Sequence, residues 1–153
     1  MGGLEMLIIS HRGYEFGPDS DLENNPKQIS KLLSKKFQIE IDVWSIHNEL
    51  YLGHDEPRYK VPISFLKNDS LWCHAKNIEA LEVLLRNGVH CFWHQEDHYT
   101  ITSRGFIWAY PQKETSGKRT VCLYPEKFNN IDYLKYDYIC TDYIYKFKKR
   151  NIL

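Results

Sequence analysis

Two histidines and two acidic residues in the first part of the chain have types and spacings that could carry out chemistry. His11 and His54 each follow a short apolar run, and Glu40 and Asp42 are separated by a single residue. Imidazole exchanges protons near neutral pH because its unperturbed pKa is about 6.5, and carboxylate oxygens are preferred ligands of hard divalent cations. These residue types therefore suit acid–base catalysis beside a metal ion.

The elements expected around these residues place them at a strand end or on one strand face. Residues 6–10 form an apolar run, which predicts a buried strand that ends at His11. The alternation over residues 37–44 predicts a second strand, on which Glu40 and Asp42 share the face opposite the aliphatic side chains. We therefore expect the histidine and the two acids to lie close together.

A predicted hairpin brings His54 to the same place. Residues 47–49 form a turn that is too short for the crossover that parallel strands need, so residues 50–53 are expected to return antiparallel to the second strand. Between the first two strands, Asn25-Pro26 opens a predicted helix that continues to about residue 36. The first third of the chain is thus a strand, a helix and a hairpin.

A second strand and helix pair follows in the middle of the chain. Residues 71–76 predict a strand with His74 and Lys76 on one face. Asn77 is a good N-cap for a helix over residues 78–86, which is followed by a glycine. Four later apolar runs are also expected to be strands: residues 89–94, 106–110, 120–124 and 138–141.

This order of elements predicts a single α/β domain over residues 1–153, with about seven parallel strands and one returning hairpin arm. The expected architecture is a reduced TIM-barrel-like (βα) barrel, either incomplete or with short helices, because ordinary barrels of this kind need roughly 200 residues or more. A chain of 153 residues with 42% hydrophobic residues can form one core. His94 and Asp142 follow later strands, and each is expected either to have a structural role or to contact a ligand.

Composition argues against several partners and locations. Twenty basic residues balance twenty acidic ones, so nucleic-acid binding driven by counterion release is not expected. The four cysteines include no C-x-x-C pair, which disfavours a zinc site and predicts buried free thiols. There is no signal-like segment and no apolar run of about 18 residues, so we expect a cytoplasmic protein without stable membrane insertion. The sequence does not specify an oligomeric state.

Four short motifs occur in the order in which they occur in a known family. They are Ser10-His11-Arg12-Gly13, Leu22-Glu23-Asn24, Ile39-Glu40-Ile41-Asp42-Val43 and Leu52-Gly53-His54-Asp55. Together with residues 138–143, which are similar to the family's last-strand motif, they resemble the glycerophosphodiester phosphodiesterases, whose barrel fold is shared with phosphatidylinositol-specific phospholipase C. The resemblance implies hydrolysis of a small glycerophosphodiester-like substrate.

The resemblance also implies roles for individual residues. His11 and His54 would exchange the roles of base and acid, and Arg12 would bind the phosphate. A phosphodiester is anionic and its leaving alkoxide is poor, so cleavage needs a proton for the leaving oxygen and positive charge beside the phosphoryl oxygens. In the family, the nucleophile can be a substrate hydroxyl next to the diester.

The metal ligands implied by the resemblance are Glu40 and Asp42, with Glu23 as a further candidate. The oxygen ligands favour Mg²⁺ or Ca²⁺. Where the family has an acid two residues before a lysine, this chain has His74 before Lys76. An imidazole ligand makes the site less negative and favours Mn²⁺ or another softer ion. Alternatively, His74 contacts the phosphate while Lys76 supplies a positive charge.

Three functions are consistent with these residues. The first is a phosphodiester hydrolase, which the complete set of histidines, acids and arginine favours. The second is a non-catalytic module that binds a phosphoryl ligand in the same pocket, which the departure at His74 weakly favours. The third is a phospholipase-like enzyme that acts at a membrane, although no amphipathic or polybasic helix is evident.

Overall fold

Strands dominate the structure, a computed structural model that describes residues 6–148. The strands are β1 (Leu7–His11), β2 (Gln38–Ile46), β3 (Glu49–Leu52), β4 (Tyr59–Val61), β5 (Leu71–Ala75), β6 (Cys91–Phe92), β7 (Tyr99–Ile101), β8 (Ile107–Ala109), β9 (Thr120–Leu123) and β10 (Tyr138–Thr141). The helices are α1 (Pro26–Ser34), α2 (Ile63–Leu66), α3 (Ile78–Arg86) and α4 (Ile144–Lys148), and 3₁₀ turns lie at η1 (Pro125–Lys127) and η2 (Tyr133–Lys135).

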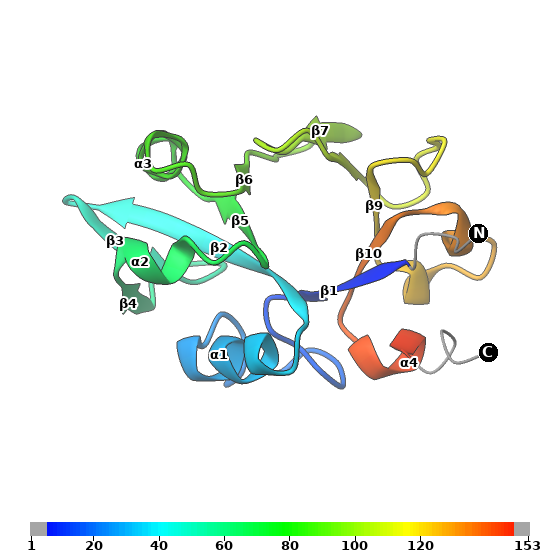
Figure 1. Cartoon of the computed structure of the whole chain (residues 1–153), viewed down its shortest axis with the longest axis horizontal. Coiled ribbons are helices and arrows are strands. Elements are labelled where there is room, and N and C mark those ends of the chain that lie inside the picture. The colour runs from blue at the N-terminus through cyan, green and yellow to red at the C-terminus, as the bar shows by residue number, and fades with distance from the viewer. Residues whose placement is uncertain (1–5, 149–153) are drawn as a thin grey trace.

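The ten strands form one sheet that is mostly parallel. Parallel pairs connect β6, β5, β2, β1, β10, β9 and β8 in that order, and β3, β4 and β7 join through antiparallel pairs. Figure 1 shows these strands following a curved path. Within residues 6–148, no ladder joins β6 to β7 or β8. The mixed α/β class is therefore confirmed, and the strand pairings do not show a closed barrel.

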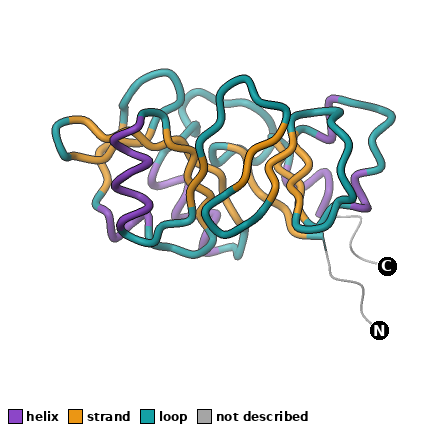
Figure 2. The backbone as a smooth tube through the Cα atoms, turned by 90° about the horizontal axis from the view of Figure 1, so that it is seen from above, coloured by secondary structure: helices purple, strands orange, loops and turns teal. Residues whose placement is uncertain are grey.

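Helices connect the parallel strands mainly in the first half of the chain. α1 lies between β1 and β2, and α3 lies between β5 and β6. In the described chain between β6 and β10, the only helical segments are the 3₁₀ turns η1 and η2. Figure 2 accordingly shows that helices cover only part of the sheet. The strands β4 and β7 were not predicted, and α1 ends before residue 36. None of the helices within residues 6–148 combines the length and the apolar character needed to cross a membrane.

The predicted helix caps are present and connect helices to strands. The side chain of Asn25 accepts a hydrogen bond from Lys27 N at 3.0 Å at the start of α1. Asn77 Oδ1 accepts from Ala80 N at 3.0 Å, and its side chain also exchanges two hydrogen bonds with the backbone of Ser45 on β2. Because one asparagine caps α3 and pairs with β2, the helix is fixed against the strand that carries the acidic residues.

The alternation of β2 separates two environments. Ile39, Ile41 and Val43 are fully buried in a cluster with apolar residues of α1 and α3. Glu40 and Asp42 face the other side of the sheet and are also buried. That inner side carries a second apolar cluster, which consists of Ile9, Trp72, Phe92, Trp108, Val121, Leu123 and Cys140. All four cysteines are buried free thiols, as predicted.

Candidate functional site

Polar side chains from neighbouring strands line one pocket of about 870 Å³ at the carboxyl ends of the parallel strands. The strand register places His11 beside Glu40 and Asp42 beside His74. Ligand sites in parallel α/β sheets commonly lie at this edge. Seven of the eight predicted site residues line the pocket: His11, Arg12, Glu40, Asp42, His54, His74 and Lys76.

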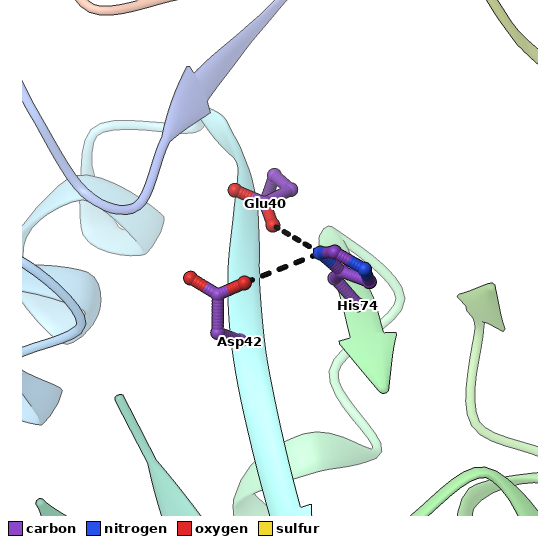
Figure 3. A group of neighbouring side chains, drawn as sticks. All are labelled: Glu40, Asp42 and His74. Atoms are coloured by element: carbon purple, nitrogen blue, oxygen red, sulfur yellow. Dashed lines mark ion pairs between the residues drawn. The ribbon is translucent and has the colours of Figure 1, made fainter. Parts of the chain in front are cut away.

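Three of these side chains form a group that could hold a metal ion. Glu40, Asp42 and His74 each offer one ligand atom, and these atoms all lie within 4.8 Å of one another. His74 Nδ1 is 3.3 Å from Asp42 Oδ1 and 4.0 Å from Glu40 Oε1. Figure 3 shows both acids pointing from β2 toward the imidazole on β5. The donor set is therefore two carboxylates and one ring nitrogen.

The orientation of His74 is fixed by contacts on two sides of its ring. Nε2 donates a hydrogen bond to the carbonyl of His94 at 3.1 Å. The ring stacks on Phe92 with a centroid distance of 5.0 Å and an interplanar angle of 7°. In a neutral imidazole that donates from Nε2, Nδ1 carries a lone pair. These contacts direct that lone pair toward Glu40 and Asp42, as occurs in metal-binding histidines.

Asn24 holds Asp42 through two hydrogen bonds. Asn24 Nδ2 donates to Asp42 Oδ2 at 2.9 Å, and Asp42 N donates to Asn24 Oδ1 at 2.9 Å. Asn24 is fully buried and has a positive φ of 55°, a conformation that asparagine adopts more readily than most residues. One carboxylate oxygen of Asp42 is thus held by an amide, and the other faces His74.

The neighbours of the two buried acids give them opposite protonation behaviour. Burial and the adjacent Asp42 carboxylate raise the pKa of Glu40 well above its usual value. Burial also opposes the ionisation of Asp42, but a hydrogen bond from His54 and the nearby positive charge of Arg12 outweigh it and lower the pKa of Asp42. Glu40 Oε2 is buried and has no hydrogen-bond partner among the described residues. The pair therefore consists of one carboxylate that is stabilised as an anion and a second carboxyl group, one oxygen of which has no hydrogen bond.

His11 lies at the centre of a chain of three polar groups. Its Nδ1 is 2.7 Å from Asp142 Oδ1, and its Nε2 is 3.1 Å from the hydroxyl of Tyr124. The carboxylate accepts from Nδ1–H, so the Nε2 lone pair of the neutral ring accepts from Tyr124. Burial lowers the pKa of His11, against the opposing effect of Asp142. Of the two roles expected for Asp142, the structure shows a hydrogen bond that orients His11.

Arg12, His54 and Lys76 surround Asp42 on the open side of the pocket. Arg12 Nη2 donates to His54 Nε2 at 3.1 Å, and Arg12 Nε lies 3.5 Å from Asp42 Oδ2. His54 Nδ1 is 3.4 Å from the same oxygen, and Lys76 Nζ is 3.9 Å from Asp42 Oδ1. The hairpin of β2 and β3 therefore delivers His54 to the pocket, and two cationic groups lie where an anionic ligand could enter.

Glu23 lies outside the group of three possible ligands. Its carboxylate accepts a hydrogen bond from the Tyr14 hydroxyl and lies 3.6 Å from Arg12 Nη1. In this structure Glu23 is therefore a neighbour of the guanidinium, and the structure does not bring it to Glu40, Asp42 and His74 as a fourth ligand.

Three residues that shape the site had no predicted role. Asn24 was visible in the Leu22-Glu23-Asn24 motif, but its pairing with Asp42 depends on the fold. Phe92 and Tyr124 had no local signal beyond an aromatic residue on or after a predicted strand. Tyr124 contacts a histidine that is 113 residues away in the chain.

Comparison of the chain with protein-family models, curated proteins and solved structures found no match.

Proposed function

We propose that the chain is a metal-dependent phosphodiester hydrolase that acts on a small, glycerophosphodiester-like substrate, with His11 and His54 as its acid–base pair. One observation carries the proposal. The group of Glu40, Asp42 and His74 lies on the wall of a pocket that is also lined by both histidines and by two cationic side chains. The order of the sequence motifs, which resembles that of the glycerophosphodiester phosphodiesterases, supports the same function.

The residues of the group fit a divalent cation. Two adjacent buried carboxyl groups, one of them with an unpartnered oxygen, are compensated best by positive charge between them. The oxygens suit Mg²⁺ or Ca²⁺, and the addition of His74 Nδ1 suits Mn²⁺. When bound, such an ion would act as a Lewis acid that neutralises charge on a phosphoryl oxygen.

The side chains around the group supply the remaining requirements. Arg12 and Lys76 can hold the phosphoryl oxygens, and Asp142 holds His11 with Nε2 toward the pocket. A substrate hydroxyl or a water forms a bond to phosphorus while its proton passes to His11 Nε2. The bond from phosphorus to the leaving alcohol breaks, and that oxygen takes a proton from His54. Each proton transfer contributes on the order of 10² to 10⁴ in rate.

A second candidate function is binding of a phosphoryl ligand without catalysis. The observation that favours it is that Nε2 of both histidines is already engaged, by the Tyr124 hydroxyl for His11 and by Arg12 for His54. For catalysis, a substrate must displace the Tyr124 hydroxyl from His11 and draw Arg12 away from His54. A ligand that leaves both contacts in place would be bound and not cleaved.

At the level of the fold, we propose that the seven parallel strands are a reduced and incompletely paired barrel. The continuous order of parallel strands and their curved path support this proposal. Because the later strands have two to four residues and few helices between them, the barrel would lack much of its outer helical layer.

A metal-by-substrate screen tests the function. Glycerophosphodiesters are incubated with Mg²⁺, Ca²⁺, Mn²⁺ or EDTA, and hydrolysis is followed by phosphorus NMR. We expect turnover with at least one ion, its loss in EDTA, and a reduction of at least roughly 10²-fold in Glu40→Gln/Asp42→Asn. The matched control Glu79→Gln/Glu82→Gln neutralises two exposed acids of α3 and should retain turnover.

The outcomes separate the two candidates. If the Glu40→Gln/Asp42→Asn variant keeps metal-dependent turnover at the wild-type rate, the ligand assignment is wrong. If the wild type binds the diesters and hydrolyses none of them with any ion, the binding module replaces the enzyme.

A further inference from the structure

A second pocket adjoins the candidate site and has no part in the proposed function. It encloses about 490 Å³, a volume typical of small-molecule sites. Its wall consists of residues 109–114, 122–123, 127–132 and 135–136. Tyr110 and Leu123 line both this pocket and the first one, so the two pockets are neighbours.

One aromatic ring connects the reacting end of the first pocket with a cation of the second. The hydroxyl of Tyr124 lies 3.1 Å from His11 Nε2, and its ring lines the first pocket. Lys127 lines the second pocket, and its Nζ lies 3.6 Å from the centre of the same ring. His11 and Lys127 therefore contact the hydroxyl and the ring face of one tyrosine.

The turn that carries this ring is held by backbone hydrogen bonds. Tyr124 has a positive φ of 54°, which turns the chain sharply from β9 into η1. Tyr124 N donates to the carbonyl of Cys140 on β10, and Lys127 N donates to the carbonyl of Tyr124. The tyrosine and the lysine thus belong to one tight turn at the border between the two pockets.

Lysines outnumber acids in the second pocket. Its charged residues are Lys113, Lys127, Lys135, Glu114 and Asp132, which gives three positive and two negative charges. Glu114 pairs with Lys135 at 3.2 Å and points largely into solvent, with 89% of its side chain exposed. Lys113 is half-buried, and no ion pair joins its ammonium to an acid in the described chain. Lys113 and Lys127 are therefore available to an anion.

The remaining lining adds no opposing charge. Burial raises the pKa of the Cys122 thiol to about 12, so this side chain is neutral. Asn129 and Asn130 provide amide groups that can donate hydrogen bonds, and Tyr136 provides a buried aromatic surface. Hydrogen-bond donors and positive charges can bind a phosphate group. The aromatic surface can contact the carbon atoms of the phosphorylated alcohol.

We propose that the second pocket is a subsite for an anionic group on the leaving alcohol of the substrate, an inference that rests on the proposed function. The preferred substrate class is then a phosphodiester with a second phosphate, as a monoester, on one of its alcohols. The diester phosphate lies between Arg12 and His11, and the terminal phosphate lies between Lys113 and Lys127.

The test compares two ligands that differ only in the terminal phosphate: glycerophosphoglycerol and glycerophosphoglycerol with a phosphate on its terminal hydroxyl. Their dissociation constants are measured by calorimetry on His11→Gln protein, so that turnover does not interfere, and the rates are measured on the wild type. We expect the phosphorylated ligand to bind about tenfold more tightly at low ionic strength, and salt to reduce this preference. In Lys113→Gln/Lys127→Gln, added to the same background, the preference should fall to about twofold or less.

Lys27→Gln is the matched control, because Lys27 is exposed on α1 and lines neither pocket. It should leave the ratio of the two dissociation constants unchanged. Equal affinities for the two ligands, or a preference that survives removal of both lysines, would overturn the subsite. Hydrolysis of both ligands without such a preference would leave the proposed function intact. A lysine-dependent preference without hydrolysis would support the subsite and reject the enzyme.

Discussion

The inner face of the sheet contains two regions that are built by the same strands and differ in chemistry. Ile9 and His11 lie on β1, and Trp72 and His74 lie on β5, two residues apart in each case. Residues two apart on a strand point to the same side. The first of each pair belongs to the apolar cluster, and the second lines the polar pocket. A step of about 7 Å along a strand therefore separates packing from the candidate chemistry.

Two histidines show what this difference means for one residue type. His90 packs against Trp72 at a ring distance of 4.4 Å, and its Nε2 pairs with Thr102 Oγ1 at 2.8 Å. His74 also contacts an aromatic ring, stacking on Phe92, but its Nδ1 faces two carboxyl groups. The aromatic contact is common to both. What distinguishes them is the polar partner of the ring: His90 pairs with a threonine hydroxyl, as a histidine with a structural role does, whereas His74 faces two carboxyl groups, as a metal ligand would.

The largest effect is expected on turnover, from changes in the polar region, and it tests the comparison between the two regions. His11→Ala and His54→Ala should each lower turnover of a phosphodiester by about 10² to 10⁴, because each removes one proton-transfer group. Metal binding, measured by calorimetry, should be retained because neither residue is in the group of three possible ligands. A variant that keeps near wild-type turnover would exclude its histidine from the acid–base pair.

The next effect is expected at the apolar region and on stability. Trp72 is 2% exposed and lies among aromatic rings of the inner cluster. Trp72→Ala should lower the free energy of unfolding by about 3–5 kcal/mol, since it leaves a large cavity. Urea unfolding measures the change. The control Phe16→Ala removes an aromatic side chain that is 78% exposed and should change stability by less than about 1 kcal/mol.

A fully stable Trp72→Ala protein would show that the apolar region is not the support of the fold. Loss of stability together with normal metal affinity in the folded fraction would show that the two regions act independently.

The sequence predicted features that depend on neighbouring residues, and it did not predict contacts between residues that are far apart in the chain. Alternation alone predicted that Glu40 and Asp42 share a face, and the short turn predicted the return of His54. Asn77 was predicted as a cap because capping depends on a few neighbouring residues. The contacts of Asn24 with Asp42 and of Tyr124 with His11 depend on strand order, which no local pattern encodes. β7 was missed because its three residues, of which Tyr99 and Ile101 are exposed, lie within a polar loop region.

A smaller effect is expected at His74, the candidate metal ligand on β5. His74→Asp replaces a ring nitrogen by a carboxylate oxygen and should tighten Mg²⁺ or Ca²⁺ relative to Mn²⁺ by about tenfold. Metal affinities measured by calorimetry check this ratio. His98→Asp makes the same change at an exposed position and should leave the ratio unchanged. An unchanged ratio in His74→Asp would place residue 74 outside the metal's ligands.

The last effect concerns the histidine of the apolar region and acid stability. Burial lowers the pKa of His90 to about 4, whereas an unfolded histidine titrates near 6.5. Between these values the unfolded chain binds more protons, so stability is full above pH 6.5 and is lost as the pH falls toward 4. From pH 7 to pH 5 this loss should amount to about 2 kcal/mol.

His90→Gln keeps a partner for Thr102 and removes the titration, so the variant should lose about 2 kcal/mol less than the wild type between pH 7 and pH 5. Urea unfolding at the two pH values measures the difference, and His98→Gln serves as the control because His98 is exposed. Equal losses in wild type and His90→Gln would mean that His90 accepts a proton without unfolding. The contrast between the two regions would then fail at this residue, because the apolar surroundings of Trp72 would not oppose a positive charge on the imidazole.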